Sequence, residues 1–325
     1  MRRAFLCGTD KLTGQNFDHR KAWLVERFKA LTEVFAIQIC SYAVLDNHYH
    51  LVLHLHEDAV STWSDEEVVR RWGMIFPNDA EKLGLLQKNG LSSLRLQETL
   101  TKWKERLKSI SWFMRCLNEP LARLSNKEDD CTGRFWEGRF RIQALLDDAA
   151  VLTAMAYVDL NPIRAGIAST LEESTFTSVC ERIQAVKKHK SLNNAKKSVS
   201  SEKIIKICDT QKQPSRLMPF SVSPKKDAKH LHPIIDFKLS DYLELVDMTG
   251  RIMRDDKKGY IPPTVRPILN RLNLTSEGWL MMVNHLETDF GRAVGHEQAL
   301  AAFKPNQMRK FKGSSKAKIY YADAA

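Results

Sequence analysis

The sequence predicts an α+β fold, and three observations carry the prediction. Apolar residues recur at helical spacing over residues 17–34. Two stretches rich in aromatic and β-branched residues follow, around 35–40 and 48–55, and the turn signal Asp46-Asn47 separates them. Helical periodicity then returns in several later segments. We therefore expect a first helix, then an antiparallel pair of strands, then mostly helices.

Length and charge set the class of protein. The 325 residues suffice for two ordinary domains or for one domain with large insertions. A chain that is 43% hydrophobic and 27% charged is typical of soluble globular proteins. The net charge of +11 favours a polyanionic partner such as nucleic acid. By itself, this charge fits a basic protein without such a partner equally well.

The six cysteines are scattered, with no short paired spacing. This argues against a zinc ribbon and against a disulfide scaffold, and it fits a reducing cytoplasm. No run of apolar residues is long enough to span a bilayer, so we expect no membrane partner. The apolar stretch after the basic start is too short for a signal peptide.

The second predicted strand alternates between two kinds of side chain. One face carries leucines and a tyrosine, and we expect it to face the core. The other face should line a polar surface or a site, and it carries His48, His50, Val52, His54 and His56.

His48 and His50 stand two residues apart, so both imidazoles project to the same side of the strand. They can reach one cation; imidazole suits Mn²⁺ or Zn²⁺, and Mg²⁺ tolerates it when oxygen ligands complete the shell. The pattern is weak alone, because a strand histidine is more often a surface residue. His54 and His56 lie about 7 Å further along for each two-residue step, where they would contact phosphate instead.

Helices follow the strands. Residues 57–110 read as a helical insertion, in which Ser64 and Glu67 form a capping box. A further helix is expected over Arg106–Leu124, because its apolar residues share one face.

A short strand around Phe140–Leu145 comes next in the prediction. Asp147 or Asp148 should then cap a helix that runs to about Leu160, since Pro162 disfavours its continuation.

Tyr157 and Asn161 stand four residues apart on this last helix and should share one face. The asparagine offers a carbonyl oxygen to a metal, and the tyrosine offers a phenol that can attack phosphorus. A free phenol with a pKa near 10 is a poor nucleophile, and a nearby cation would help it. Alternatively, Tyr157 packs in the core and Asn161 caps the helix before Pro162.

A segment rich in arginine and aromatic residues spans 133–141. Arginine guanidinium groups form bidentate hydrogen bonds with phosphates, and aromatic rings stack on unpaired bases. The competing interpretation is a tight turn with Phe135 and Trp136 in the core. The candidate nucleic-acid contacts, with one later arginine, are Arg134, Trp136, Arg139, Arg141 and Arg164.

Composition divides the chain into three parts. Residues 1–184 form the predicted core, including the insertion at about 57–110. Residues 185–235 are rich in lysine and serine and poor in large apolar residues, as in a mobile basic linker. Residues 236–325 regain helical periodicity and end in a basic tail, which predicts a small helical domain.

Four motifs in order resemble the HUH endonucleases with a single catalytic tyrosine, and among them the REP-associated tyrosine transposases. The resemblance covers roughly residues 35–170. The motifs are Tyr42-Ala-Val-Leu-Asp-Asn-His-Tyr-His-Leu-Val-Leu, Phe113-Met-Arg-Cys-Leu-Asn, Gly133-Arg-Phe-Trp-Glu-Gly-Arg-Phe and Tyr157-Val-Asp-Leu-Asn-Pro-Ile-Arg-Ala-Gly.

The resemblance implies a ferredoxin-like antiparallel sheet with helices, in which His48 and His50 bind Mg²⁺ or Mn²⁺ and Asn161 supplies a further ligand. It implies that Tyr157 attacks a phosphate of single-stranded DNA at hairpin-forming repeats, leaving a 5′-phosphotyrosine and a free 3′-hydroxyl. A second 3′-hydroxyl can reverse the link, which is strand transfer. The resemblance also implies a cytoplasmic, nucleoid-associated protein that is a monomer or a homodimer.

Family members usually have a strand before the stretch that begins here at Arg2. We therefore expect either a start upstream of Met1 or a truncated copy. Two other functions stay open: a protein that binds hairpin DNA or RNA without turnover, and a metal-dependent hydrolase that uses an activated water while Tyr157 is structural.

Overall fold

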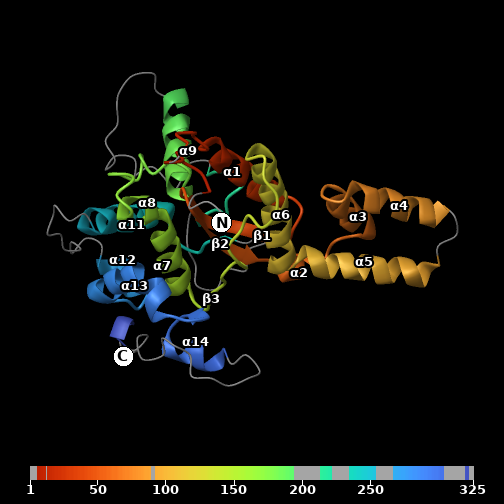
Figure 1. Ribbon diagram of the computed structural model, residues 1–325. Helices are drawn as coiled ribbons and strands as arrows, with labels where there is room; N and C mark the ends of the chain where they lie inside the picture. Colours follow the sequence, from red (N-terminus) through yellow and green to blue (C-terminus); the bar gives the residue numbers. More distant parts are fainter. Residues whose placement is uncertain are drawn as a thin grey trace. The chain divides into compact units, whose positions relative to one another are not determined.

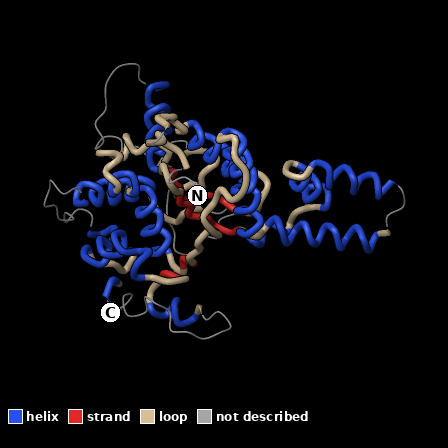
Figure 2. The backbone as a smooth tube through the Cα atoms, viewed as in Figure 1, coloured by secondary structure: helices blue, strands red, loops and turns tan. Residues whose placement is uncertain are grey.

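The computed structural model describes residues 6–11, 13–88, 92–193, 213–221, 234–253, 266–303 and 319–321. The fold is α+β and mainly helical (Figure 2), as the sequence predicts. The chain divides into two compact units. Unit 1 comprises Met1–Ile39, Val44–His48 and Leu53–Phe140, and unit 2 comprises Cys40–Ala43, Tyr49–Val52 and Arg141–Ala325.

Two strands form the main sheet, β1 (Ile37–Val44) and β2 (Tyr49–Leu55). They pair in an antiparallel ladder, and within the described residues this sheet has no third strand. The ferredoxin-like arrangement therefore stays a prediction. A separate parallel pair joins β3 (Ala144–Leu145) to β4 (Ala293–Val294).

Strand β2 corrects the prediction that its leucine face alone packs in the core. The fully buried residue of β2 is Val52, which lies on the histidine face, while Leu51, Leu53 and Leu55 are half-buried. Both faces of this strand are therefore partly covered, and alternation of side chains alone did not identify the more buried one.

Unit 1 is built around one helical pair, which Figure 1 labels α1 and α6. Arg20 of α1 is 1% exposed, and it donates to Glu128 Oε2 at 2.6 Å and to Asp129 Oδ1 at 2.5 Å. A buried guanidinium needs such partners, because an unpaired charge in the interior is costly. The helices of this unit are α1 (His19–Thr32), α2 (Glu57–Ser61), α3 (Asp65–Gly73), α4 (Pro77–Lys88), α5 (Ser93–Leu107) and α6 (Ile110–Glu128).

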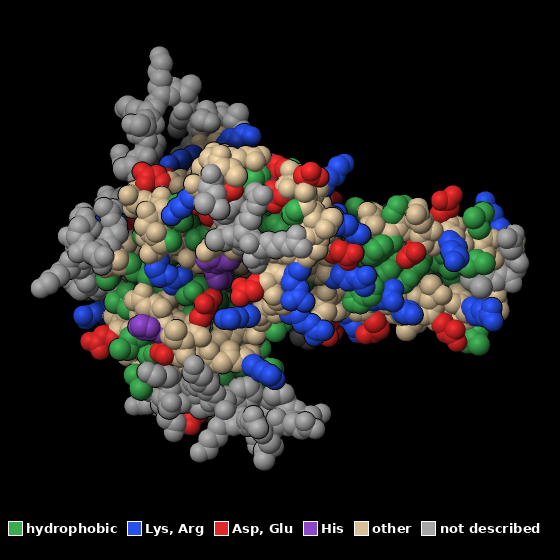
Figure 3. All heavy atoms as spheres, viewed as in Figure 1, with side chains coloured by type: hydrophobic (Ala, Val, Ile, Leu, Met, Phe, Trp, Pro, Cys, Tyr) green, Lys and Arg blue, Asp and Glu red, His purple; other side chains and the backbone are tan. Residues whose placement is uncertain are grey.

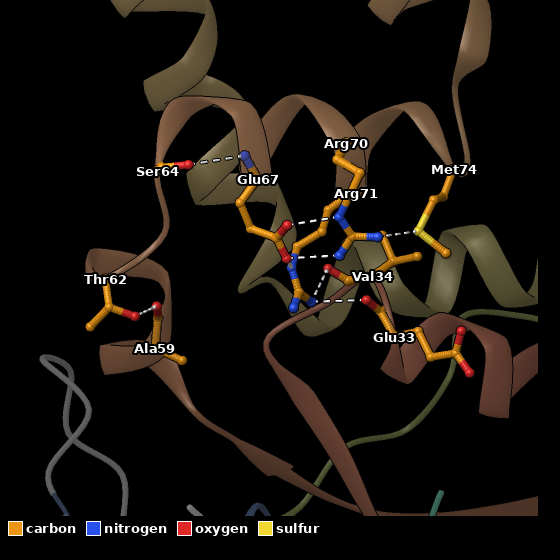
Figure 4. Close-up of polar contacts among 9 residues, drawn as sticks. All are labelled: Glu33, Val34, Ala59, Thr62, Ser64, Glu67, Arg70, Arg71 and Met74. Carbon is orange, nitrogen blue, oxygen red and sulfur yellow. Dashed lines mark hydrogen bonds and ion pairs between the residues drawn. The ribbon is translucent and has the colours of Figure 1, made fainter. Parts of the chain in front are cut away.

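Helix α3 begins at the predicted cap (Figure 4). The Ser64 hydroxyl accepts a hydrogen bond from the Glu67 backbone N–H. The Glu67 carboxylate accepts from Arg70 and Arg71. Arg71 also donates to the carbonyl oxygens of Glu33 and Val34, just after α1, so one arginine ties the insertion to the first helix.

Residues 57–110, predicted as a helical insertion, hold the helices α2 to α5, and aromatic rings pack against one another there. Trp72 stacks on Trp103 with ring centroids 5.2 Å apart, and Trp112 packs against Trp72 at 5.8 Å. Figure 3 shows basic and acidic side chains interspersed over α3 to α5. The visible surface of these helices is therefore no uniform basic patch.

Unit 2 centres on α7, against which α11 and α13 pack (Figure 1). The helices of this unit are α7 (Asp148–Asp159), α8 (Asn161–Arg164), α9 (Ser178–Asn193), α11 (Leu239–Met253), α12 (Arg266–Arg271), α13 (Ser276–Asp289) and α14 (Glu297–Ala302). The buried Trp279 of α13 donates its indole N–H to the hydroxyl of the buried Thr249 of α11 at 2.9 Å, which satisfies both polar atoms between these helices.

Two predicted elements differ in extent. The helix expected from Arg106 begins instead at Ile110. Helix α5 runs to Leu107, and the extended backbone at Ser109 separates it from α6. The strand expected over Phe140–Leu145 is only Ala144–Leu145, and its partner β4 comes from the C-terminal part of the chain.

The predicted mobile linker contains ordered pieces. Helix α9 continues to Asn193, and Leu217, Met218 and Phe220 are buried. The buried Arg182 donates to the Met218 carbonyl oxygen at 3.0 Å. The rest of the linker, 194–212 and 222–233, lies outside the described residues, as do residues 1–5 and the basic tail at 304–318.

No helix within the described ranges is long and apolar enough to cross a membrane.

Candidate active site

Helix α7 presents Tyr157 at the edge of a buried environment. Nine of its twelve residues are buried, whereas Tyr157 is half-buried. The helix begins where the sequence predicts, because the Asp147 carboxylate accepts from the Ala150 N–H at 2.7 Å. The phenol is therefore held by a rigid helix and still reaches the surface of unit 2.

A buried carboxylate two residues later fixes the end of α7. Asp159 is fully buried and accepts from the Ser178 hydroxyl at 2.6 Å, the Val179 N–H at 3.0 Å and the Tyr242 hydroxyl at 2.6 Å. These donors belong to α9 and α11. Three donors compensate much of the cost of burying a carboxylate, and they tie the tyrosine helix to two others.

The structure brings His50 and Tyr157 together within unit 2. Their ring centroids lie 5.7 Å apart with an interplanar angle of 89°, which is an edge-to-face contact. His50 comes from β2 and Tyr157 from α7, so a strand and a helix far apart in sequence converge at this point. A residue from each of two separate motifs thus meets the other through its ring.

Two charged residues flank the phenol. The Arg164 guanidinium lies 3.8 Å from the centroid of the Tyr157 ring and donates to the carbonyl oxygens of Tyr157 at 3.5 Å and Val283 at 3.4 Å. The Glu287 carboxylate of α13 is near enough to Tyr157 to raise the pKa of its phenol. Its Oε1 also lies 3.8 Å from His50 Nδ1.

The surroundings act on the phenol in opposite directions. Burial raises the pKa of Tyr157 most, and the Glu287 carboxylate raises that pKa further, whereas the Arg164 guanidinium lowers it. The net direction is upward, so the phenol is protonated at neutral pH in this environment. A reaction of Tyr157 as a nucleophile therefore needs additional positive charge or a proton acceptor.

The other two predicted metal ligands are placed differently. His48 precedes β2 and belongs to unit 1, where its exposed Nδ1 lies 2.5 Å from Asn47 Oδ1. Asn161 is 6% exposed and begins α8, since Leu160 interrupts the helix. Tyr157 and Asn161 thus lie on two successive helices, which corrects the expectation of one continuous helix.

His54 has a separate environment. Its Nδ1 is buried without a hydrogen-bond partner in the described part of the chain, and burial lowers the pKa of the ring. The predicted role of His54 as a phosphate contact stays a prediction, and a neutral ring would serve it less well than a charged one.

Two candidate donor atoms for a cation lie near each other in unit 2. His50 Nδ1 and Glu287 Oε1 are 3.8 Å apart, and Mg²⁺ binds its ligands at about 2.1 Å, so one ion between them is within reach of both. No group of three or more His, Cys, Asp or Glu side chains converges within the described ranges. A complete shell therefore needs other oxygen donors, such as amide, phenol or water.

The segment at 133–141 has features of both a tight turn with packed aromatic residues and an exposed basic surface. Phe135 is buried and Trp136 is half-buried, with its indole N–H donating to the Asn118 carbonyl at 2.9 Å. Arg134 and Arg139 are exposed in unit 1. The aromatic residues thus anchor a turn, and these two arginines are free to reach solvent.

The last two predicted contacts lie in unit 2, where Arg141 is exposed and Arg164 is engaged with Tyr157. Glu287 was missed by sequence reasoning. It lies far beyond the motifs in the chain, and only the packing of α13 on α7 brings it to the site.

Comparison with protein-family models, with curated proteins and with solved structures gave no match.

Proposed function

We propose that this chain is a metal-dependent single-stranded DNA endonuclease and strand transferase, a transposase that forms a 5′-phosphotyrosine intermediate at hairpin-forming repeats. The observation that carries the proposal is the contact of His50 with Tyr157, at 5.7 Å between ring centroids. It unites the two motifs whose combination suggests this chemistry. The proposal includes a ferredoxin-like core for the His-bearing sheet.

In the proposed reaction the Tyr157 oxygen attacks a DNA phosphorus. The phenol O–H bond breaks as the new O–P bond forms, and the bond from phosphorus to the 3′-oxygen breaks. The phenol proton passes to an acceptor, and the leaving 3′-oxygen takes a proton from solvent. Mg²⁺ or Mn²⁺, bound by His48 and His50 with Asn161, would polarise the scissile phosphate when present.

Several residues have defined tasks in this proposal. Tyr157 is the nucleophile, and Arg164 holds its ring while opposing the rise in its pKa. Arg134, Trp136, Arg139 and Arg141 would contact single-stranded or hairpin DNA through phosphate and base stacking. The net charge of +11 supports a polyanionic substrate.

A second function is favoured by one specific observation. Burial and Glu287 raise the pKa of Tyr157, which disfavours the phenolate. A protein that binds hairpin DNA or RNA without cleaving it needs no phenolate, and the same exposed arginines would serve it. Replacing Tyr157 by phenylalanine distinguishes the two functions, since binding alone would survive.

The test uses a hairpin oligonucleotide labelled at its 3′ end, incubated with the full chain and Mn²⁺, and resolved on a denaturing gel. The label then stays on the fragment that becomes linked to the protein. We expect a shifted protein–DNA band that requires Mn²⁺, Tyr157 and His50. Free 5′-phosphate product without an adduct would instead indicate a hydrolase that uses activated water.

A further inference from the structure

We propose that Glu287, on the C-terminal helix α13, is a ligand of the divalent cation that His50 binds. The inference rests on the proposed function, from which it takes the cation. It goes beyond that function by adding a carboxylate to a ligand set of two histidines and an amide. It also assigns a task to the C-terminal part of the chain.

The geometry around Glu287 points to a shared ion. Its Oε1 lies 3.8 Å from His50 Nδ1, which is longer than a hydrogen bond. Two donor atoms at this separation leave room for a cation within about 2.1 Å of each. Because both residues belong to unit 2, the pair is defined without reference to the other unit.

A third oxygen donor is adjacent. The Glu287 carboxylate raises the pKa of the Tyr157 phenol, so the two side chains are neighbours. One imidazole, one carboxylate and one phenol therefore surround the same region. Hard divalent cations such as Mg²⁺ and Mn²⁺ prefer oxygen ligands and pair readily with carboxylates.

Charge makes the carboxylate a stronger candidate ligand than an amide. Asn161 offers a neutral oxygen and is 6% exposed. The Glu287 side chain is 56% exposed, so an ion can reach it from solvent, and it carries a negative charge. A carboxylate at this place would hinder an approaching DNA phosphate unless a cation neutralised it.

The packing of α13 keeps Glu287 in position. Helix α13 packs along α7, and Arg164 donates to the Val283 carbonyl oxygen; the helix then kinks at His285, whose backbone is not helical, before it reaches Glu287. The arginine that lies over the Tyr157 ring thus also contacts the backbone of the helix that carries the carboxylate. The nucleophile and the proposed ligand thus lie on two helices that pack against each other.

The test measures Mn²⁺ binding by the full chain, with free Mn²⁺ followed by electron paramagnetic resonance. We expect Glu287→Gln to weaken Mn²⁺ binding by about tenfold or more, because even partners of metal ligands affect affinity by 10–100-fold. Glu287→Asp should recover part of the affinity, and His50→Ala should weaken binding comparably.

Glu277→Gln is the matched control, since Glu277 is an exposed glutamate on the same helix and loses the same charge. It should bind Mn²⁺ like the unmodified chain. Unchanged thermal unfolding of the metal-free Glu287→Gln chain would show that its fold is retained. Mn²⁺ affinity of Glu287→Gln within twofold of the unmodified chain, or no Mn²⁺ binding by any chain, overturns the proposal.

The outcome is separable from that of the proposed function. Glu287-dependent Mn²⁺ binding without a protein–DNA adduct would support the ligand and contradict the transposase. If Glu287→Gln binds Mn²⁺ normally and the protein–DNA adduct still forms, the result would support the transposase and contradict Glu287 as a ligand.

Discussion

The imidazole of His50 stands at 89° to the phenol ring of Tyr157, with the ring centroids 5.7 Å apart. The contact joins a residue of β2 to a residue of α7. It places a metal-binding type of side chain beside a potential nucleophile, and Arg164 and Glu287 flank the pair with opposite charges. Substitutions at these and neighbouring residues separate tasks at the site from contributions to folding.

Arg164→Gln should slow adduct formation more than it weakens DNA binding. The guanidinium lowers the pKa of Tyr157 against the larger effect of burial, so its loss leaves the phenol harder to ionise. We expect the single-turnover rate constant to fall about tenfold, which corresponds to about 1.4 kcal/mol in the barrier.

Arg141→Gln is the control, because Arg141 is exposed in the same unit. It should weaken DNA binding and reduce the slope of log affinity against log salt concentration by about one. The rate of adduct formation at saturating DNA should change little. Equal effects of both variants on affinity and rate would contradict the assignment of Arg164 to the reaction and of Arg141 to DNA binding.

Tyr242→Phe should destabilise unit 2. It removes a hydroxyl that donates to the buried Asp159 carboxylate at 2.6 Å. Hydrogen bonds to charged groups contribute about 1.5–3 kcal/mol, so urea unfolding followed by circular dichroism should show a loss of this size. A loss below about 0.5 kcal/mol would mean that the carboxylate does not depend on this donor.

Glu67→Gln should affect stability in a pH-dependent way. The Arg70 guanidinium, with help from Arg71, lowers the pKa of Glu67 to about 2 from an ordinary value of 4.5. A lowered carboxyl pKa gives stability that is present above pH 4.5 and is lost as the pH falls towards 2.

The substitution should therefore cost about 0.5–1 kcal/mol at pH 7, as for partly exposed ion pairs, and progressively less below pH 4.5. Urea unfolding of both chains at several pH values measures the difference. A cost that is the same at every pH would show that the ionised carboxylate contributes nothing.

Gly133→Ala should strain the turn that carries the exposed arginines. Gly133 has φ +98°, a backbone conformation that side chains rarely adopt, and the substitution should cost about 1–2 kcal/mol. Gly138→Ala is the control, since an added methyl group there meets open space. Thermal unfolding of the two variants should differ, and equal midpoints would argue against strain at Gly133.

Local signals predicted much of the fold. The Ser64 and Asp147 caps occur as expected, and the strand pair follows from its turn and its aromatic and β-branched residues. The limits were set by long-range packing. The burial of Val52 depends on elements distant in sequence, and so does the pairing of Leu145 with Val294.

The candidate site was predictable in part for the same reason. His50 and Tyr157 stood out because each lies in a distinctive motif. Glu287 lies on helix α13 just after its kink at His285, and nothing in its local sequence distinguishes it from an exposed glutamate such as Glu277. Its relevance arises from the packing of α13 on α7.

The most direct test of the central claim is the denaturing gel with 3′-labelled hairpin DNA and Mn²⁺, comparing the unmodified chain with Tyr157→Phe. The proposed tyrosine chemistry predicts a protein–DNA band in the first lane and none in the second, with hairpin binding retained by both chains on a native gel. An adduct that persists in Tyr157→Phe, or cleavage of DNA without any adduct, would contradict the assignment of Tyr157 as the nucleophile.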